Sequence, residues 1–144
     1  MPIRIAINGF GRIGKNIVRA LYERGLTDHI ELVAINDLGS PDVLAHLLQF
    51  DTVHGRFAAQ VEAGIDSLSI DNHTISVYAE RDPSQLPWQA LNIDVVLECT
   101  GLFTERDKAK AHIDAGAKKV IISAPGKNVD ATVVFGVNDE ILTA

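Results

Sequence analysis

A glycine-rich turn between a predicted strand and a predicted helix constrains this chain more than any other feature. The apolar run 3–8 predicts a strand, and Gly9, Gly11 and Gly14 follow it in the spacing Gly-x-Gly-x-x-Gly. Asp37 closes the next apolar run, roughly 20 residues further along, where dinucleotide-binding proteins place an acidic residue. Strand, glycines, helix and acid in this order predict a βαβ unit that binds a dinucleotide.

We expect each residue of this fingerprint to have a physical role. Gly9 allows the tight turn out of the strand, Gly11 lets the backbone approach a pyrophosphate, and Gly14 lets the helix pack closely on the strand. The helix directs free N–H groups and its positive dipole end at the phosphates, while Asp37 accepts hydrogen bonds from the adenosine ribose. The alternative is a glycine-rich turn that holds no ligand.

Hydrophobic periodicity predicts the helix and the second strand of this unit. Apolar residues recur at helical spacing after the turn: Ile13, Ile17, Val18 and Leu21. Arg19 falls among the polar positions, and Gly25 is expected to end the helix. The run 30–36 predicts a strand that is buried on both faces over most of its length and is reached by a right-handed crossover.

The rest of the chain continues the alternation of helices and strands. A helix is expected over 41–49, with Ser40 as its N-cap. Four of its apolar residues are expected to face the core: Val43, Leu44, Leu47 and Leu48. The other expected elements are strands over 94–98, 119–123 and 132–135, and a helix from Thr104 to Ala115 that ends at Gly116.

The segment 51–92 differs in character and is expected to be an irregular insertion. Short alternating runs at 68–70 and 74–78, joined by Asp71-Asn72-His73, predict an antiparallel hairpin, and Trp88 is expected in a packed loop. The fold class is therefore α/β, with a Rossmann-type, doubly wound, mostly parallel sheet and a small antiparallel insertion.

Ligands of such sheets bind beyond the carboxyl ends of the strands. Four expected strand ends carry short polar or glycine-containing pairs: Asn8-Gly9, Asn36-Asp37, Thr100-Gly101 and Ser123-Ala124. We therefore expect the binding site at this edge of the sheet.

Length and composition limit the class of protein. The 144 residues are enough for one domain, which we expect to span residues 1–144. A formal net charge of −6 argues against nucleic acid or an anionic membrane as a partner, and no apolar run of about 18 residues predicts a transmembrane helix. The start of the chain lacks a signal-peptide pattern, and a lone cysteine, Cys99, excludes an internal disulfide. We expect a soluble cytoplasmic domain.

Seven short motifs, in order over nearly the whole chain, carry a family resemblance. They are Ala-Ile-Asn-Gly-Phe-Gly-Arg-Ile-Gly from Ala6, Ala-Ile-Asn-Asp-Leu from Ala34, His-Gly-Arg-Phe from His54, Glu-Arg-Asp-Pro from Glu80, Glu-Cys-Thr-Gly from Glu98, Ile-Ser-Ala-Pro from Ile122 and Val-Val-Phe-Gly-Val-Asn from Val133. Together they resemble the cofactor-binding half of glyceraldehyde-3-phosphate dehydrogenase. Their agreement in sequence and spacing is more specific than the glycine fingerprint alone.

The resemblance implies NAD as the cofactor and a role for each matching residue. Asn8 and the glycine loop belong to the cofactor site, Arg12 and Ile13 offer backbone N–H groups to the pyrophosphate, and Asp37 holds the adenosine ribose. The remaining implied site residues are Arg81 near the adenine, Thr100 and Gly101 along the middle of the cofactor, and Ser123 on the nicotinamide side. Arg81 as a solvated loop cation, and Thr100 as a residue that only satisfies a strand end, remain open alternatives.

The catalytic residues of the family have no match in this sequence. The family nucleophile lies in a Ser-Cys-Thr-Thr-Asn motif shortly after the Gly-Val-Asn segment, and the chain stops at Ala144, before that motif. Cys99 follows a buried strand and is expected to be an inert core thiol. The five histidines have no spacing that suggests a metal site. We therefore expect a cofactor-binding domain that is inactive alone.

The resemblance implies that the intact protein oxidises a phosphorylated aldehyde to an acyl phosphate with NAD, as a homotetramer. Erythrose-4-phosphate dehydrogenase is a close alternative, although Ser123-Ala124-Pro125 favours the glyceraldehyde-3-phosphate enzymes. A stand-alone nucleotide-binding module is an alternative from a different class. A Ser-Cys-Thr-Thr-Asn motif downstream of Ala144 in the parent gene would exclude the module.

Overall fold

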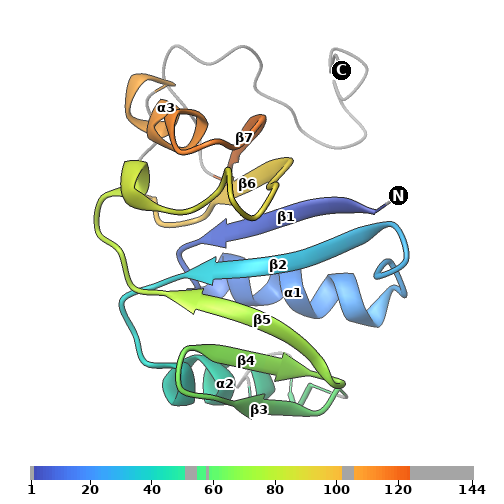
Figure 1. Ribbon diagram of the computed structural model, residues 1–144. Coiled ribbons are helices and arrows are strands. Elements are labelled where there is room, and N and C mark those ends of the chain that lie inside the picture. Colours follow the sequence, from blue (N-terminus) through green and yellow to red (C-terminus); the bar gives the residue numbers. More distant parts are fainter. Residues whose placement is uncertain (1, 51–54, 58, 102–105, 124–144) are drawn as a thin grey trace.

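The strands of the chain form one sheet, with helices packed on both of its faces (Figure 1). The computed structural model describes residues 2–50, 55–57, 59–101 and 106–123. In that part of the chain the sheet has seven strands, in the order β3-β4-β5-β2-β1-β6-β7. The strands are β1 (Ile3–Asn8), β2 (Ile30–Asn36), β3 (Val61–Ala63), β4 (Ser67–Ile70), β5 (His73–Tyr78), β6 (Val95–Glu98) and β7 (Lys119–Ile122). The helices are α1 (Arg12–Glu23), α2 (Pro41–Gln49), α3 (Arg106–Asp114) and the 3-10 turn η1 (Pro83–Gln85).

The parallel part of the sheet confirms the expected fold class. β1 pairs in parallel with β2 and β6, β2 pairs in parallel with β5, and β6 pairs in parallel with β7. β4 pairs antiparallel with both β3 and β5. The expected strand 132–135 and the start of the expected helix at Thr104 lie outside the described residues.

The antiparallel hairpin is confirmed, but it does not lie in a separate insertion. Its second strand, β5, pairs with β2 and so extends the main sheet, while the three-residue strand β3 was not expected. Asp71 and Asn72 have φ values of 48° and 70°, the left-handed pair that a two-residue hairpin turn requires, and His73 already belongs to β5. The turn is therefore one residue shorter than the sequence indicated.

Two hydrophobic clusters lie on opposite faces of the sheet because successive strand residues point to opposite sides. Ile5 and Ile7 pack in the larger cluster with α1 and α2, which lie behind the sheet in Figure 1. Ala6 packs in the smaller cluster with Trp88 and Ala117, near α3. Strands β1 and β2 are thus buried on both faces over most of their length, as expected for β2, and Trp88 is 0% exposed in its packed loop.

Helix α1 ends as predicted, and one of its predicted polar positions, Arg19, is buried. The N–H of Leu26 donates to the carbonyl of Leu21 and that of Gly25 to Tyr22, a Schellman motif with Gly25 at a φ of 65°. Val18 and Leu21 of the predicted apolar positions are buried and Ile13 is 49% exposed, whereas Arg19, expected among the polar positions, is 3% exposed. The Arg19 guanidinium is buried because it donates to backbone carbonyls at the end of α2.

Helix α2 begins at its predicted cap. The Ser40 hydroxyl oxygen accepts from the N–H of Val43 at 3.5 Å, and Pro41 occupies the first turn. Leu44 and Leu48 are buried as expected, but Val43 and Leu47 were wrongly assigned to the core, because each is more than one-third exposed. None of the described helices is long and apolar enough to cross a membrane.

Candidate functional site

The register of the sheet brings the predicted site residues to one edge. Asn8, the last residue of β1, is paired with Asn36 of β2 on one side and with Glu98 of β6 on the other. The N–H of Gly9 donates to the carbonyl of Asn36, and the N–H of Cys99 donates to that of Asn8, both at 2.8 Å. The glycine loop therefore leaves the sheet between the carboxyl ends of β2 and β6.

The three glycines of the loop differ in what surrounds them. Gly9 has a φ of +92°, and a Cβ there would lie 2.7 Å from the Thr100 Cγ2 and 2.8 Å from the Thr100 nitrogen. A Cβ on Gly14 would overlap the carbonyl oxygen of Gly9. Gly11 is exposed and has no atom within 4 Å of an added Cβ. Gly9 and Gly14 are thus required by packing, and the space over Gly11 is open to a ligand.

The N-terminus of α1 lies directly after this open position. Gly11 is the N-cap residue and contributes no side-chain cap, and the first turn of the helix contains no acidic residue. Gly11, Arg12 and Ile13 are all exposed. A helix that starts without a cap leaves backbone N–H groups and the positive end of its dipole available to an anion.

Asp37 lies beside the same loop. One of its carboxylate oxygens accepts from the N–H of Phe10 and the other from the N–H of Gly39, each at 2.9 Å. The residue is half-buried, and each oxygen has further lone pairs for a ligand hydroxyl. The carboxylate is thus held next to the glycine loop.

The other predicted site residues occupy neighbouring strand ends. Gly101, at a φ of +77°, and Ser123 are exposed at the ends of β6 and β7. Arg81 is exposed and follows β5, which lies next to β2. Thr100 is half-buried and its hydroxyl donates to Glu98 at 2.6 Å, so this group does satisfy a strand end.

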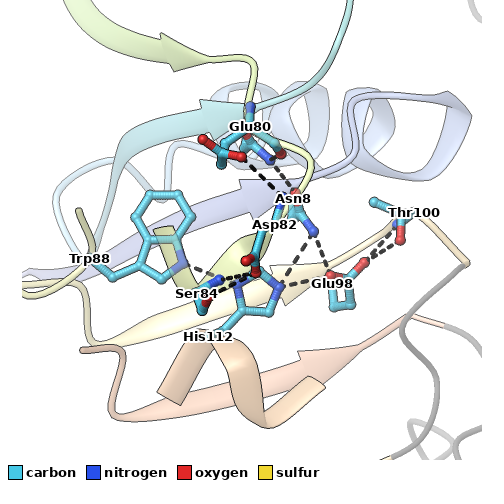
Figure 2. A network of polar contacts seen from close by, with 9 residues as sticks. Asn8, Glu80, Asp82, Ser84, Trp88, Glu98, Thr100 and His112 are labelled. Carbon is cyan, nitrogen blue, oxygen red and sulfur yellow. Dashed lines mark hydrogen bonds and ion pairs between the residues drawn. The ribbon is translucent and has the colours of Figure 1, made fainter. Parts of the chain in front are cut away.

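A buried polar network lies directly beneath the loop and was not predicted (Figure 2). Asn8 donates from Nδ2 to Glu98 Oε1 at 2.6 Å and accepts at Oδ1 from Asn36 at 2.7 Å. His112 of α3 contacts the same Glu98 oxygen at 2.8 Å, and the Trp88 indole N–H donates to His112 Nδ1 at 3.0 Å. The sequence does show polar residues at three strand ends, Asn8, Asn36 and Glu98. It does not show that they meet a side chain of α3.

Cys99 differs from a reactive cysteine in its surroundings. It is half-buried and packs against the larger hydrophobic cluster. Burial raises the pKa of its thiol, a hydrogen bond with Ser123 lowers it in part, and the nearby Glu98 carboxylate raises it. No group of three or more histidine, cysteine or acidic residues within the described ranges could hold a metal ion.

Comparison with known proteins decides the family. The sequence model described as "Glyceraldehyde 3-phosphate dehydrogenase, NAD binding domain" matches residues 3–106, which include the glycine loop, Asp37 and Thr100. The chain belongs to this family. Its cofactor is accordingly NAD, because the matching model describes the NAD-binding domain of the family.

Curated relatives agree over the entire chain. A glyceraldehyde-3-phosphate dehydrogenase of Pseudomonas aeruginosa is 59% identical over 144 residues, which is 100% of this chain and 43% of the relative. The chromosomal glyceraldehyde-3-phosphate dehydrogenase of Cupriavidus necator is 57% identical over 145 residues, with the same coverage, and that of Xanthobacter flavus is 54% identical over 143 residues. The chain therefore spans less than half the length of the relatives it matches.

Proposed function

We propose that the chain binds NAD across the carboxyl edge of its sheet, over the glycine loop. The backbone N–H groups of Arg12 and Ile13 hold the pyrophosphate, and the Asp37 carboxylate accepts hydrogen bonds from the adenosine ribose. The observation that carries this placement is the 2.9 Å hydrogen bond between Asp37 and the N–H of Phe10, which joins the acid to the phosphate loop.

The remaining predicted residues extend the site along the strand ends. Arg81 lies next to the adenine, Thr100 and Gly101 line the middle of the cofactor, and Ser123 lies on the nicotinamide side. Asn8 supports the site from below, because its side chain is 3% exposed and both ends of its amide are engaged. The order of the strands, from β5 through β2, β1 and β6 to β7, matches this order along the cofactor.

Calorimetric titration of the 144-residue chain with NAD and with NADP tests the placement. We expect a single site that prefers NAD, because the Asp37 charge repels a 2′-phosphate. A second titration with Gly11→Val locates the pyrophosphate, since a side chain there occupies the open space above the loop. Binding of NAD that is unchanged in Gly11→Val would move the cofactor away from this loop.

We further propose that the intact parent protein is a phosphorylating, NAD-dependent dehydrogenase of a phosphorylated aldehyde. In such an enzyme a cysteine thiolate adds to the aldehyde, hydride passes to NAD, and phosphate releases the thioester as an acyl phosphate. Residues 1–144 contain one cysteine, Cys99, whose raised pKa does not suit a nucleophile, so we propose that they are inactive alone. Family membership supports a homotetramer for the parent.

Glyceraldehyde-3-phosphate is the proposed substrate, and the name of the Pseudomonas aeruginosa relative supports it. Erythrose-4-phosphate is the second candidate, although the motif Ser123-Ala124-Pro125 favours the glyceraldehyde-3-phosphate enzymes. Assay of the parent protein with both aldehydes, by the rate of NADH formation with phosphate present, separates the two. A higher kcat/KM for erythrose-4-phosphate would make that aldehyde the favoured substrate.

A further inference from the structure

Two chains of hydrogen bonds converge on the buried carboxylate of Glu98 (Figure 2). The first starts at the backbone N–H of Glu80, which donates to Asn36 Oδ1 at 2.8 Å. Since Asn36 Oδ1 is the acceptor, its Nδ2 donates to Asn8 Oδ1, and Asn8 Nδ2 in turn donates to Glu98 Oε1. A backbone N–H can only donate, so it orients both amides in the same direction, toward Glu98.

The second chain starts at Trp88. Its indole N–H can only donate, so His112 Nδ1, 3.0 Å away, is the acceptor and carries no proton. The His112 ring is therefore neutral, with its proton on Nε2, and it donates to Glu98 Oε1 at 2.8 Å. The Asn8 Nδ2 and His112 Nε2 atoms, 3.4 Å apart, are then two donors to one oxygen and not bonded to each other.

These directions require an ionised carboxylate at position 98. Glu98 is 1% exposed, and its second oxygen, Oε2, accepts from the Thr100 N–H at 3.0 Å and from the Thr100 hydroxyl at 2.6 Å. Burial raises the pKa of Glu98, but the hydrogen bonds from His112, Thr100 and Asn8 outweigh it and lower the pKa overall. An amide in place of the carboxylate would set an N–H against a donor in either orientation.

Glu98 holds both sides of the turn that starts the glycine loop. Through Oε1 it fixes Asn8, the residue before Gly9, and through Oε2 it fixes Thr100. Thr100 lies directly against Gly9, since its Cγ2 is 2.7 Å from the position that a Gly9 Cβ would take. A shift of either residue would move the backbone that leads to the N–H groups at the start of α1.

We propose that Glu98 is a positioning residue for the NAD site, which sets the Gly9 turn through Asn8 and Thr100 without touching the cofactor. Trp88 and His112 hold the carboxylate from the opposite side and connect α3 to the loop. The inference rests on the proposed placement of NAD over this loop. It assigns to the buried residues Glu98, His112 and Trp88 a part in cofactor affinity that their burial alone would not indicate.

The test compares Glu98→Gln with the wild-type chain and with Glu31→Gln as a matched control. Glu31, near the start of β2, forms an ion pair with Arg4 of β1 at 2.6 Å. Its substitution removes the same charge at the end of the strand opposite the loop. At a temperature where Trp88 fluorescence and circular dichroism show all three folded, we expect the Kd for NAD to rise about tenfold or more in Glu98→Gln only. An unchanged Kd in folded Glu98→Gln would overturn the inference.

A second variant keeps the test decisive if Glu98→Gln does not fold. Thr100→Val preserves the branched shape against Gly9 and removes only the hydroxyl that donates to Glu98. We expect a Kd several-fold above that of the wild type. Where Glu98→Gln does fold, we expect the double variant to bind no more weakly than the poorer single variant, because the Thr100 hydroxyl acts through Glu98. Wild-type affinity in Thr100→Val, or strictly additive losses, would overturn the inference. Failure of the wild-type chain to bind NAD would instead contradict the proposed function.

Discussion

The Asp37 carboxylate accepts a hydrogen bond from the backbone N–H of Phe10 at 2.9 Å, so the acid at the end of β2 is attached to the loop that follows β1. Its second oxygen accepts from the N–H of Gly39 and closes a short turn before α2. The acid and the glycine loop are therefore one structural unit. A substitution at Asp37 is expected to affect both the ribose contact and the loop.

The first prediction concerns cofactor choice at Asp37. The wild-type chain is expected to prefer NAD over NADP, and Asp37→Ala should weaken NAD binding by roughly 1.5–3 kcal/mol, the range for a hydrogen bond to a charged group. The side chains of residues 26–55 include no lysine or arginine that could receive a 2′-phosphate. Isothermal titration calorimetry with each cofactor measures both effects.

Asp37→Asn is the matched variant for this prediction. It removes the charge and keeps one oxygen, which can accept from the Phe10 N–H, whereas the Gly39 N–H loses its acceptor. The contact with the loop after β1 is therefore retained while the repulsion of a 2′-phosphate is lost. The ratio of NADP to NAD affinity should therefore rise. Equal affinity of the wild-type chain for both cofactors would contradict the assigned role of Asp37.

The second prediction separates two glycines of the loop. Gly11→Val should remain folded, with a loss of about 1 kcal/mol or less because valine is a poorer N-cap than glycine, and should abolish NAD binding, because its Cβ meets no atom within 4 Å and fills the space above the loop. Gly14→Ala should lose stability by about 1–3 kcal/mol, because the new Cβ overlaps the Gly9 carbonyl oxygen. Thermal melts followed by circular dichroism, with calorimetry for NAD, distinguish the two effects. Equal stability of the two variants would be inconsistent with this packing.

The third prediction concerns the buried cation Arg19. Its guanidinium donates to the carbonyls of Leu48, Gln49 and Gly55 at 2.8–3.1 Å and lies 5.4 Å from the centre of the Phe57 ring. Arg19→Met should lower the free energy of unfolding by at least about 1–3 kcal/mol, since buried carbonyls lose their donors. Urea denaturation measures the loss.

Arg24→Met is the control for Arg19, because Arg24 follows the same helix and is exposed. It should change the free energy of unfolding by less than about 0.5 kcal/mol, as is usual for surface substitutions. Similar losses in the free energy of unfolding for the two variants would show that burial of Arg19 does not contribute to stability.

The fourth prediction is a pH dependence that arises from Glu98. Because hydrogen bonds lower its pKa in the folded chain despite burial, the unfolded chain takes up this proton first as the pH falls. The stabilisation is thus complete above the ordinary glutamate pKa of about 4.3 and is lost as the pH falls further, through the folded pKa. The stability difference between wild type and Glu98→Gln should shrink below about pH 4. A constant difference from pH 7 to pH 3 would contradict it.

The fifth prediction concerns Cys99. The 144-residue chain should form no NADH from glyceraldehyde-3-phosphate, with or without phosphate, because its one thiol is half-buried and has a raised pKa. Cys99→Ser should bind NAD as the wild type does, and alkylation of the native thiol should be slow. Turnover that disappears in Cys99→Ser would overturn both expectations. Absorbance at the NADH band is the measurement.

Local features of this protein were predictable from sequence because they depend on neighbouring residues. The Gly9-to-Gly14 turn, the Ser40 cap, and the helix ends at Gly25 and Gly116 each follow from the conformational needs of a few adjacent positions. The position of Asp37 at the end of the second strand is likewise a local feature. Family motifs extended this to the identity of the cofactor.

The tertiary structure decided which side chains meet. Asn8 and Glu98 are 90 residues apart in sequence, and their contact depends on the parallel register of β1 with β6. Periodicity alone placed Arg19 in solvent, because the carbonyls that receive it belong to another helix. Trp88 and His112 pair only because α3 folds back over the sheet. The sequence by itself thus determined the loop and its ligand, whereas the support beneath the loop required the packed sheet, since burial and hydrogen-bond partners come from distant parts of the chain.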